Sequence, residues 1–411
     1  MLNEAGNAPT SATDQGVEGS GDGAATTIPA GSGTLLQLLR DGAPRTRSEL
    51  ASVTGLARST IAQRVEALLS QGLLISAGEA ISTGGRPPTR FAFNPGAGLT
   101  IGADLGATHA RLAVTDLAGA TLSETRAYLD IGLGPEPVLD WVIEHGRELL
   151  AATGRDSVPL LGVGLGLPGP VEHSVGRPVN PPIMPGWDGF DVRGYVTERM
   201  HAPTLVDNDV NIMALGEYFT AWSDARHLMF VKAATGIGCG IIIDGRVHRG
   251  AQGAAGDMGH IQVTRAEDMV CRCGNTGCLE AVASGAAVAA RLTEQGIPTR
   301  NSPDVVMLAR GGSVPALRLV RQAGRDIGEV LAAAVNMLNP SVIVIGGSLS
   351  EVGEHLIAGV RESVYQRSLP LATQHLRIAS SRTGESAGVI GAAVMVIEHS
   401  LAPERLDSGI H

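Results

Sequence analysis

Apolar residues near the start of the chain recur at helical spacing in three short segments. The pattern predicts helices within residues 33–42, 46–55 and 57–70. Their apolar positions are Leu35, Leu36, Leu38, Leu39, Leu50, Ala51, Val53, Ile61, Val65, Leu68 and Leu69. Gly55 permits a tight turn between the second and third segments, and Thr46 or Ser48 can cap the second. This spacing is typical of a helix-turn-helix.

A two-stranded wing is predicted after the third helix. Residues 73–75 and 91–93 flank a tip that reads Gly84-Gly85-Arg86-Pro87-Pro88. The polar face of the third helix carries side chains that can donate to phosphates and base edges in a major groove: Arg58, Ser59, Thr60, Gln63 and Arg64. Arg86 could enter a minor groove. These features predict DNA binding; the alternative is a helical bundle that mediates protein contacts.

Strand and helix patterns alternate along the rest of the chain. Strands are predicted at 100–103, 111–115, 161–167, 228–231, 240–243 and 342–345, and helices at 138–152, 207–220, 314–338 and 385–398. The alternation predicts two α/β lobes after an all-α winged helix-turn-helix. The expected divisions are a disordered acidic tail at 1–30, the winged helix at 31–94, an N-terminal lobe at 95–205 with helix 385–400 packing back on it, a C-terminal lobe at 206–384 and a tail at 401–411.

Composition and charge narrow the function classes. Hydrophobic residues make up 44% of the 411 residues, which is enough for a large core. The net charge of -10 argues against a general polyanion binder, but it divides into -4 for residues 1–33, +3 for 34–94 and -9 for the remainder. The positive charge therefore lies on the segment expected to contact DNA.

Two further features bear on location and on nucleotide binding. The chain has neither an apolar run approaching the ~18 residues of a membrane span nor a signal-peptide pattern at Met1, so we expect a cytoplasmic protein without a membrane partner. Lys232 is the only lysine, which rules out a phosphate loop ending in Gly-Lys-Ser/Thr.

Three of the four cysteines form a compact motif. His260 is followed by Cys271, Cys273 and Cys278 with Cys-x-Cys-x4-Cys spacing. Three thiolates and one imidazole are suited to a tetrahedral structural Zn²⁺ site, and Gly274 and Gly277 would let the chain fold back to the same ion. The alternative is buried free thiols beside an unrelated histidine. Cys239 lies apart in a Gly-rich turn and is expected to be a small packed residue.

Glycines and polar residues follow several predicted strands. Candidate phosphate or nucleotide positions are Asp104, Gly106, Thr108, Thr235, Gly236, Gly238, Gly346 and Gly347. Candidate positions for holding sugar hydroxyls are Gly169, Asn208, Asp209, Asp257, His260 and Glu280. Each such loop is common in α/β proteins, and each polar residue could instead be a cap or a surface group.

The motifs together resemble the ROK family of repressors, open reading frames and kinases from about residue 31 to residue 400. The matching segments are Asp-x-Gly-x-Thr at 104–108, Pro-Gly-Pro at 168–170, Asn-Asp at 208–209, Thr-Gly-x-Gly-x-Gly at 235–240, x-x-Gly-His at 257–260 and Cys-x-Cys-Gly-x-x-Gly-Cys-x-Glu at 271–280. The resemblance implies the two-lobed actin-like, hexokinase-like ATPase fold. The leading winged helix resembles the transcriptional-regulator branch, in which sugars or sugar phosphates control operator binding.

The same resemblance implies roles for the matched residues. Asn208, Asp209, His260 and Glu280 would hold sugar hydroxyls, and Gly169 would line the pocket. Asp209 would be the general base if phosphorylation occurs. His260 would bind zinc through one ring nitrogen and orient the sugar through the other. The three clustered cysteines, Cys271, Cys273 and Cys278, would complete the zinc site.

Two departures from the kinase pattern bear on activity. Ala107 replaces a glycine, so its Cβ would narrow the loop for the γ-phosphate and make a positive φ costly. Asp257 replaces a longer glutamate, which shortens its reach to a sugar hydroxyl. We therefore expect a sugar-responsive regulator, most simply a repressor, acting as a homodimer or homotetramer. The alternative is an ATP- and Mg²⁺-dependent sugar kinase, such as a glucokinase, with an appended winged helix.

Overall fold

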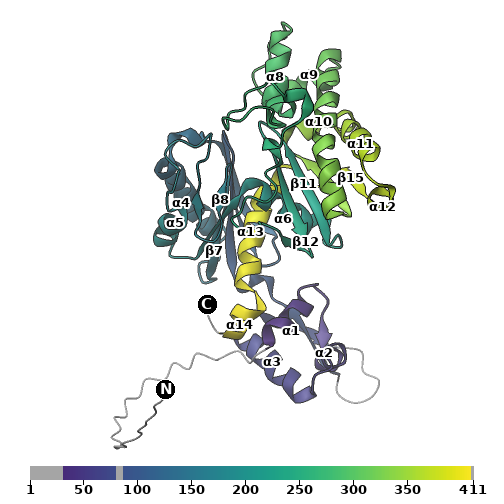
Figure 1. Ribbon diagram of the computed structural model, residues 1–411. Coiled ribbons are helices and arrows are strands. Elements are labelled where there is room, and N and C mark those ends of the chain that lie inside the picture. Colours follow the sequence, from purple (N-terminus) through teal and green to yellow (C-terminus); the bar gives the residue numbers. More distant parts are fainter. Residues whose placement is uncertain (1–30, 80–86, 409–411) are drawn as a thin grey trace, which may run out of the picture.

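The computed structural model describes residues 31–79 and 87–408, and it divides into a small head and two α/β lobes (Figure 1). The head contains helices α1 (Ser32–Leu39), α2 (Arg47–Thr54) and α3 (Arg58–Ser70). Its antiparallel sheet has the order β1-β3-β2, from β1 (Arg45–Thr46), β2 (Leu74–Glu79) and β3 (Thr89–Phe93). The predicted acidic tail at 1–30 and the wing-tip Arg86 lie outside the described residues.

Local sequence explains the head helices. Thr46 caps α2 by accepting a hydrogen bond from the Glu49 N–H, and the Glu49 carboxylate accepts in return from the Thr46 N–H. Gly55 ends α2 in the left-handed region at φ 69°. The predicted helix-turn-helix is therefore confirmed. The head is not all-α, however, because Arg45 and Thr46 add a third strand to the expected wing.

The N-terminal lobe contains a mixed five-stranded sheet with the order β10-β7-β4-β5-β6. Its strands are β4 (Leu99–Leu105), β5 (His109–Asp116), β6 (Thr121–Tyr128), β7 (Leu160–Leu167) and β10 (Thr204–Asn208). Helices α4 (Pro135–Ala152) and α5 (Val192–Met200) pack on one face through apolar side chains such as Val142 and Val196. A short ribbon, β8 (Val171–Glu172) with β9 (Arg177–Pro178), extends from the lobe.

The C-terminal lobe contains a second mixed sheet with the order β13-β12-β11-β14-β15. Its strands are β11 (His227–Ala233), β12 (Ile237–Ile243), β13 (Arg246–Val247), β14 (Val342–Gly346) and β15 (Arg377–Ser380). The helices after the first hairpin are α7 (Glu280–Ala283), α8 (Gly285–Glu294), α9 (Ser302–Arg310), α10 (Val314–Leu338), α11 (Glu354–Arg367) and α12 (Pro370–Thr373). They bury one face of the sheet, and α10 has the bounds that the apolar pattern predicts.

Two helices, α6 (Asp209–Ala221) and α13 (Ala387–Ser400), lie between the two sheets. They pack directly on each other because glycines remove side chains at the contact. A Cβ built on Gly391 would lie 1.7 Å from the Ile212 carbonyl oxygen, and one on Gly216 would lie 2.0 Å from that of Ala387. The α13 helix also packs on β4 and β7, as expected for the segment that returns to the N-terminal lobe.

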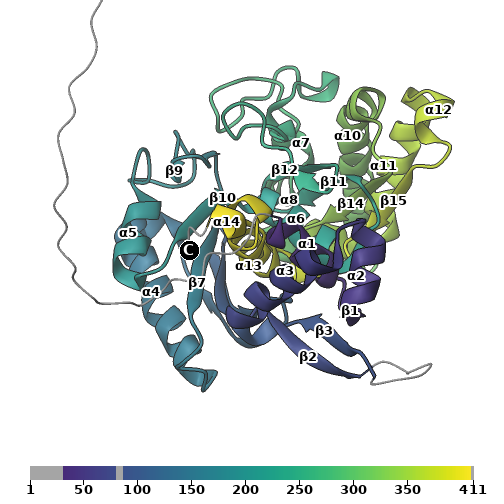
Figure 2. The same ribbon diagram turned by 90° about the horizontal axis from the view of Figure 1, so that it is seen from below.

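The end of the chain differs from the prediction. Residues 401–411 were expected to be a tail, but Pro403–Ser408 form helix α14 beside the head (Figures 1 and 2). Leu406 is buried in the head core with residues of α1. Asp407 accepts hydrogen bonds from the N–H groups of Gly31 and Gly33, at 2.6 and 2.9 Å. The short, polar segment 403–408 has no apolar pattern that predicts a helix. Its stability depends on contacts with the head.

One described segment, Gly384–Ser408, is long and apolar enough to cross a membrane by length and composition alone. Within the fold, 61% of its apolar window is buried between the lobes and against the head. Its hydrophobicity is therefore accounted for by packing inside the protein.

Candidate functional site

The Asn208–Asp209 motif lies where β10 gives way to α6. The Asn208 side chain caps α6 by accepting from the Val210 N–H at 2.9 Å, while its amide group donates to the Gly169 carbonyl at 2.9 Å. Gly169 and Asn208, two predicted sugar positions, are thereby brought together. Both polar atoms of the Asn208 side chain hold the loop at Gly169 against the start of α6.

Asp209 forms a buried ion pair with Lys232 on β11. The Lys232 ammonium donates to the Asp209 carboxylate, and only 4% of Asp209 is exposed. Asp104, at the end of β4, is also buried and adds negative charge from the N-terminal lobe. Burial alone would lower the pKa of Lys232, but the Asp209 and Asp104 carboxylates raise it above its usual range. The lysine is therefore held charged between the two lobes.

The segment at 104–108 begins with the last two residues of β4, which extends beyond the predicted strand at 100–103. Burial raises the pKa of Asp104, and the nearby Lys232 ammonium opposes this shift. Gly106 lies under the His109 ring, where a Cβ would come within 1.9 Å of it. Ala107 is not among the described residues with positive φ, so the expected backbone strain from replacing glycine does not arise. Thr108 is exposed at the end of this loop.

The Gly-rich segment at 235–240 begins in the tight turn between β11 and β12 and continues into β12. The Ala234 N–H donates to the Gly236 carbonyl at 3.0 Å, which closes the turn. Close packing requires several of these glycines. A Cβ on Gly238 would lie 2.8 Å from a Val210 methyl group, and one on Gly240 would lie 2.6 Å from the Val210 carbonyl oxygen. These glycines let the strand approach the first turn of α6, next to Asp209.

The remaining predicted nucleotide positions lie at the end of β14. Gly346 packs against the Phe230 ring, and Gly347 adopts φ 82° beside the Ala233 carbonyl. Gly346 also pairs with Lys232 across β14 and β11. The three Gly-containing loops thus end near the Asp209–Lys232 ion pair, from separate strands.

Glu280 and the segment at 257–260 lie beside the turn after β11. The Glu280 carboxylate accepts from the Ile237 N–H at 3.0 Å and lies next to Gly236. His260 Nε2 is 3.9 Å from an Asp257 carboxylate oxygen. Asp257 therefore reaches the neighbouring histidine, and Glu280 connects the cysteine segment to the turn at 235–240.

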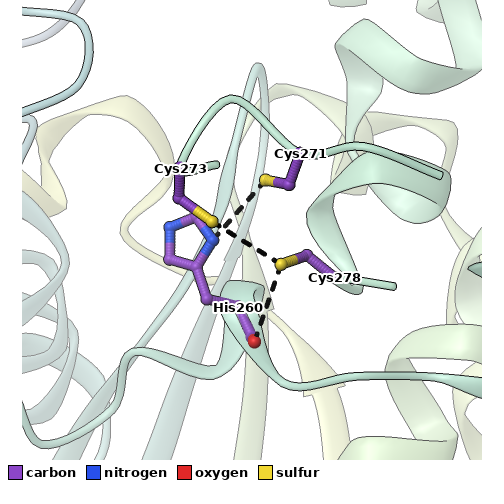
Figure 3. Close-up of side chains that lie close together, drawn as sticks. All are labelled: His260, Cys271, Cys273 and Cys278. Carbon is purple, nitrogen blue, oxygen red and sulfur yellow. Dashed lines mark hydrogen bonds between the residues drawn. The ribbon is translucent and has the colours of Figure 1, made fainter. Parts of the chain in front are cut away.

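His260 and three cysteines converge in a cluster that could hold a metal ion (Figure 3). Their potential ligand atoms all lie within 4.8 Å of one another. His260 Nδ1 is 3.7 Å from Cys271 Sγ, and Cys273 Sγ is 3.7 Å from Cys278 Sγ. Thiolates bound to one tetrahedral zinc lie about 3.8 Å apart, whereas a disulfide is about 2.05 Å long. The spacing fits shared coordination better than a disulfide.

The chain folds back at the two glycines that the sequence indicated. Gly274 and Gly277 have φ values of 92° and 84°, a region that favours glycine. Backbone bridges join Val270 to Thr276 and Gln262 to Cys278. Cys239 lies outside the cluster on β12, and burial raises the pKa of its thiol to about 12. Its separation from the other cysteines is as predicted.

The predicted DNA-contacting side chains lie at the start of α3. Arg58, Ser59 and Gln63 are exposed, and Thr60 is half-buried. Arg64 is also half-buried, and its guanidinium lies so close to Gly31 that a Cβ there would come within 2.4 Å. The exposed part of the predicted face is therefore formed by Arg58, Ser59 and Gln63.

Sequence reasoning gave no role to Lys232 or His109. The sequence did contain a signal for Lys232. It is the only lysine in the chain, and it lies three residues before the motif at 235–240. His109 directly follows the Asp-x-Gly-x-Thr motif, but only the fold places its ring on Gly106.

Comparisons with known proteins follow the same division into head and lobes. Residues 100–399 match the ROK family. A putative xylose repressor from Caldicellulosiruptor sp. (strain Rt8B.4) is 31% identical over 382 residues, which cover 90% of this chain and 95% of the repressor.

Two solved structures extend this comparison. A ROK family transcriptional regulator, a homologue of the E. coli MLC protein, superposes with a TM-score of 0.80 and 26% identity over 93% of this chain and 98% of its own. A ROK family glucokinase from Streptomyces griseus, in complex with glucose and AMPPNP, gives a TM-score of 0.63 and 27% identity. That match covers 99% of the glucokinase but 72% of this chain.

Proposed function

Because the chain belongs to the ROK family, we propose that it is a sugar-responsive, DNA-binding transcriptional regulator that represses genes for carbohydrate uptake or catabolism. One observation carries the proposal: similarity to regulators extends over 90% and 93% of the chain, whereas similarity to the glucokinase covers 72%. The additional length is what a regulator needs and a kinase does not, namely a head that contacts DNA.

The DNA-contacting surface is the exposed start of α3. Arg58 and Gln63 can donate to phosphates and base edges when this helix enters a major groove. Arg64 contributes to DNA binding indirectly, because its guanidinium lies against Gly31 and supports the head. Arg86 would add a contact from the wing.

The sugar effector binds between the lobes. Asp209 and Glu280 offer carboxylate oxygens, His260 offers a ring nitrogen, and the loop at Gly169 is held in place by Asn208. Asp257 contributes to sugar binding indirectly, through its contact with His260. A sugar bound here would contact elements of both lobes and would favour one degree of closure over another.

Zinc holds the segment that carries His260 and Glu280. The donor set of one imidazole and three thiolates suits Zn²⁺, and four protein ligands leave no position for a reactive water. The ion would be structural. It would fix the hairpin between the two sugar-contacting residues.

The regulator acts as a cytoplasmic homodimer or homotetramer. An exposed apolar patch at the ends of α10 and α12 supports self-association: Met337 is 82% exposed, Leu369 70% and Leu371 78%. Two heads in one assembly would read half-sites whose spacing depends on the orientation of the subunits.

DNA fragments from upstream of the coding sequence provide the test. We expect the full chain to bind such DNA, and a sugar panel to change the affinity. Arg58→Ala should weaken binding about 5- to 100-fold and reduce the salt dependence by about one counterion. Arg318→Ala removes an exposed arginine on α10 and is the matched control. Unchanged affinity and salt dependence in Arg58→Ala would remove α3 from the interface.

The second candidate function is ATP-dependent sugar phosphorylation. It is favoured by Asp209 beside an intact 235–240 turn and by the fit to a glucokinase fold. In that case Asp104, Gly106, Thr108, Thr235, Gly236, Gly238, Gly346 and Gly347 would surround ATP and Mg²⁺. Assays of hexoses and amino sugars with ATP distinguish the two functions. Turnover in the wild type that disappears in Asp209→Asn would establish the kinase and contradict a purely regulatory role.

A further inference from the structure

An open cavity of about 730 Å³ lies where the N-terminal lobe meets the helices that lead to the head. It is separate from the residues around Asp209. Its lining comes from the turn between β8 and β9, from α5, from the segment that leads into the start of β10, and from α13 and α14. The lining residues are His173, Ser174, Arg193, Thr197, His201, Ala202, Pro203, Thr204, Leu205, His399 and Arg405. A volume of this size accommodates a small organic ligand.

The lining is basic and contains no acidic residue. It carries Arg193, Arg405 and three histidines. Arg193 is fixed by donating to the carbonyls of His173 and Ser174, both at 2.7 Å. The Asp207 carboxylate lies 3.7 Å from His173, but it is already paired with Arg249. The positive charge facing the cavity is therefore not neutralised by a lining residue.

His399 and Arg405 are in direct contact. Their side chains form a hydrogen bond between His399 Nε2 and the Arg405 guanidinium. Arginine can only donate, so His399 Nε2 must accept and the ring must be neutral. Burial first, and then the charges of Arg405, His173 and Arg193, lower the pKa of His399. Burial and Arg249 likewise lower the pKa of His173.

Helices α13 and α14, which carry His399 and Arg405, also hold the head. Arg40, directly after α1, pairs with Glu398 at 2.6 Å, and the Gln37 side chain donates to the Leu401 carbonyl at 2.7 Å. Asp407, two residues after Arg405, accepts from the N–H groups of Gly31 and Gly33. A ligand that contacts Arg405 is thus within one helical turn of the hydrogen bonds that fix the start of α1.

We propose that this cavity is a second ligand site that binds a small phosphate-bearing anion and fixes the head relative to the lobes. The anion supplies the negative charge that the lining lacks, with Arg405 and His201 as donors. Binding of a dianion favours protonation of His399 and His173, which frees the Arg405 guanidinium for the anion. This site goes beyond the sugar site between the lobes and does not depend on it.

Calorimetric titration of the full chain with sulfate tests the site, because sulfate remains a dianion between pH 6.0 and 7.5. We expect binding that is at least about threefold tighter at pH 6.0 than at pH 7.5. Arg405→Ala should weaken it at least about tenfold. His201→Asn, which tolerates the positive φ of 52° at this position, is the second variant and should also weaken it.

Controls separate this cavity from the rest of the molecule. Arg318→Ala, at an exposed arginine outside the cavity, should leave sulfate affinity unchanged. Wild-type affinity in both Arg405→Ala and His201→Asn would overturn the proposal, and so would an equal loss of affinity in Arg318→Ala. Glucose 6-phosphate and inorganic phosphate, compared at equal ionic strength, then distinguish a phosphorylated sugar from free phosphate as the source of the anion.

Hydrogen exchange tests the effect on the head. Saturating sulfate should slow exchange of backbone amides in α1 and α14 of the wild type at least about threefold. The same amides in Arg405→Ala should not respond. Equal exchange with and without sulfate in the wild type would contradict the role in fixing the head.

Discussion

The ammonium group of Lys232 is hydrogen-bonded to the carboxylate of Asp209. The only lysine in the chain is thus paired with the residue that family resemblance implies as a general base. The pair lies where β11 meets the first turn of α6, with Asp104 contributing a second negative charge. The ammonium occupies one Asp209 oxygen, so under the proposed function a sugar hydroxyl would donate to the other.

Lys232→Met should destabilise the protein because it leaves the buried Asp209 carboxylate without its partner. Removing one member of a buried ion pair costs about 3–5 kcal/mol. Denaturant unfolding of the wild type and the variant measures the effect. Adding Asp209→Asn to Lys232→Met should recover much of the loss, because the neutral amide needs no counter-charge.

The control for this prediction is Arg226→Met. Arg226 pairs with Asp244, but their side chains are 74% and 60% exposed. An exposed pair contributes about 1 kcal/mol or less. Similar losses for the buried and the exposed pair would show that burial does not determine the contribution of Lys232.

Gly391→Ala should also destabilise the protein, by about 1–3 kcal/mol, because α6 leaves no room for a methyl group on α13. The added Cβ would lie 1.7 Å from the Ile212 carbonyl oxygen, so the two helices must move apart. Melting temperature measures the effect. Gly96→Ala is the control, since a Cβ there would lie 3.4 Å from the nearest atom, the Asn94 side-chain oxygen. A wild-type melting temperature for Gly391→Ala would disprove the close helix contact.

The His260–cysteine cluster should bind about one zinc ion per chain. Cys278→Ser should reduce the zinc content sharply and lower the melting temperature, since it removes a buried ligand. Elemental analysis of purified protein measures the metal directly. Cys239→Ser should retain zinc because Cys239 lies outside the cluster. Equal zinc content in all three proteins would exclude Cys278 as a ligand.

Stability should fall as the pH is lowered below about 6.5, the ordinary pKa of histidine. The folded protein lowers the pKa of His399 and His173, so the unfolded chain binds protons more readily. Protonation therefore favours unfolding below the unfolded pKa, and the stabilisation is fully present only above it. The groups facing these histidines are Arg193 of α5, His201, Arg405 of α14, and Asp207 with Arg249.

Melting temperatures at pH 7.5 and 5.5 measure this dependence. His399→Gln should lose less stability than the wild type over this interval, because it removes one of the titrating groups. His355→Gln, on the exposed surface of α11, should behave as the wild type. A larger loss of stability between pH 7.5 and 5.5 in His399→Gln than in the wild type would contradict this prediction.

Some elements could be predicted well because their causes are local. The α3 helix begins within one residue of the expected start and ends at Ser70, and α10 has the expected bounds. Periodic apolar residues and the break at Gly55 are sufficient to define these elements. The cysteine cluster is similar: its ligands are close in sequence, and Gly274 and Gly277 supply the turns.

Other elements depend on contacts that are distant in sequence. The helix expected from residue 207 begins at Asp209, because Asp207 and Asn208 pair with β7 and extend β10. Helix α14 forms because Leu406 and Asp407 contact the head, more than 360 residues earlier in the chain. No local pattern contains these interactions, so a tail was the natural expectation for residues 401–411.

The sequence by itself determined the ROK family membership, the helix-turn-helix and the alternation of strands and helices in the lobes, because each follows from local periodicity or closely spaced motifs. Tertiary structure decided which charges meet. It pairs Lys232 with Asp209, places Arg64 against Gly31 and brings His399 and Arg405 to the base of the head. Long-range electrostatics and close packing depend on distances between residues. These distances are fixed only when the two sheets assemble around α6 and α13.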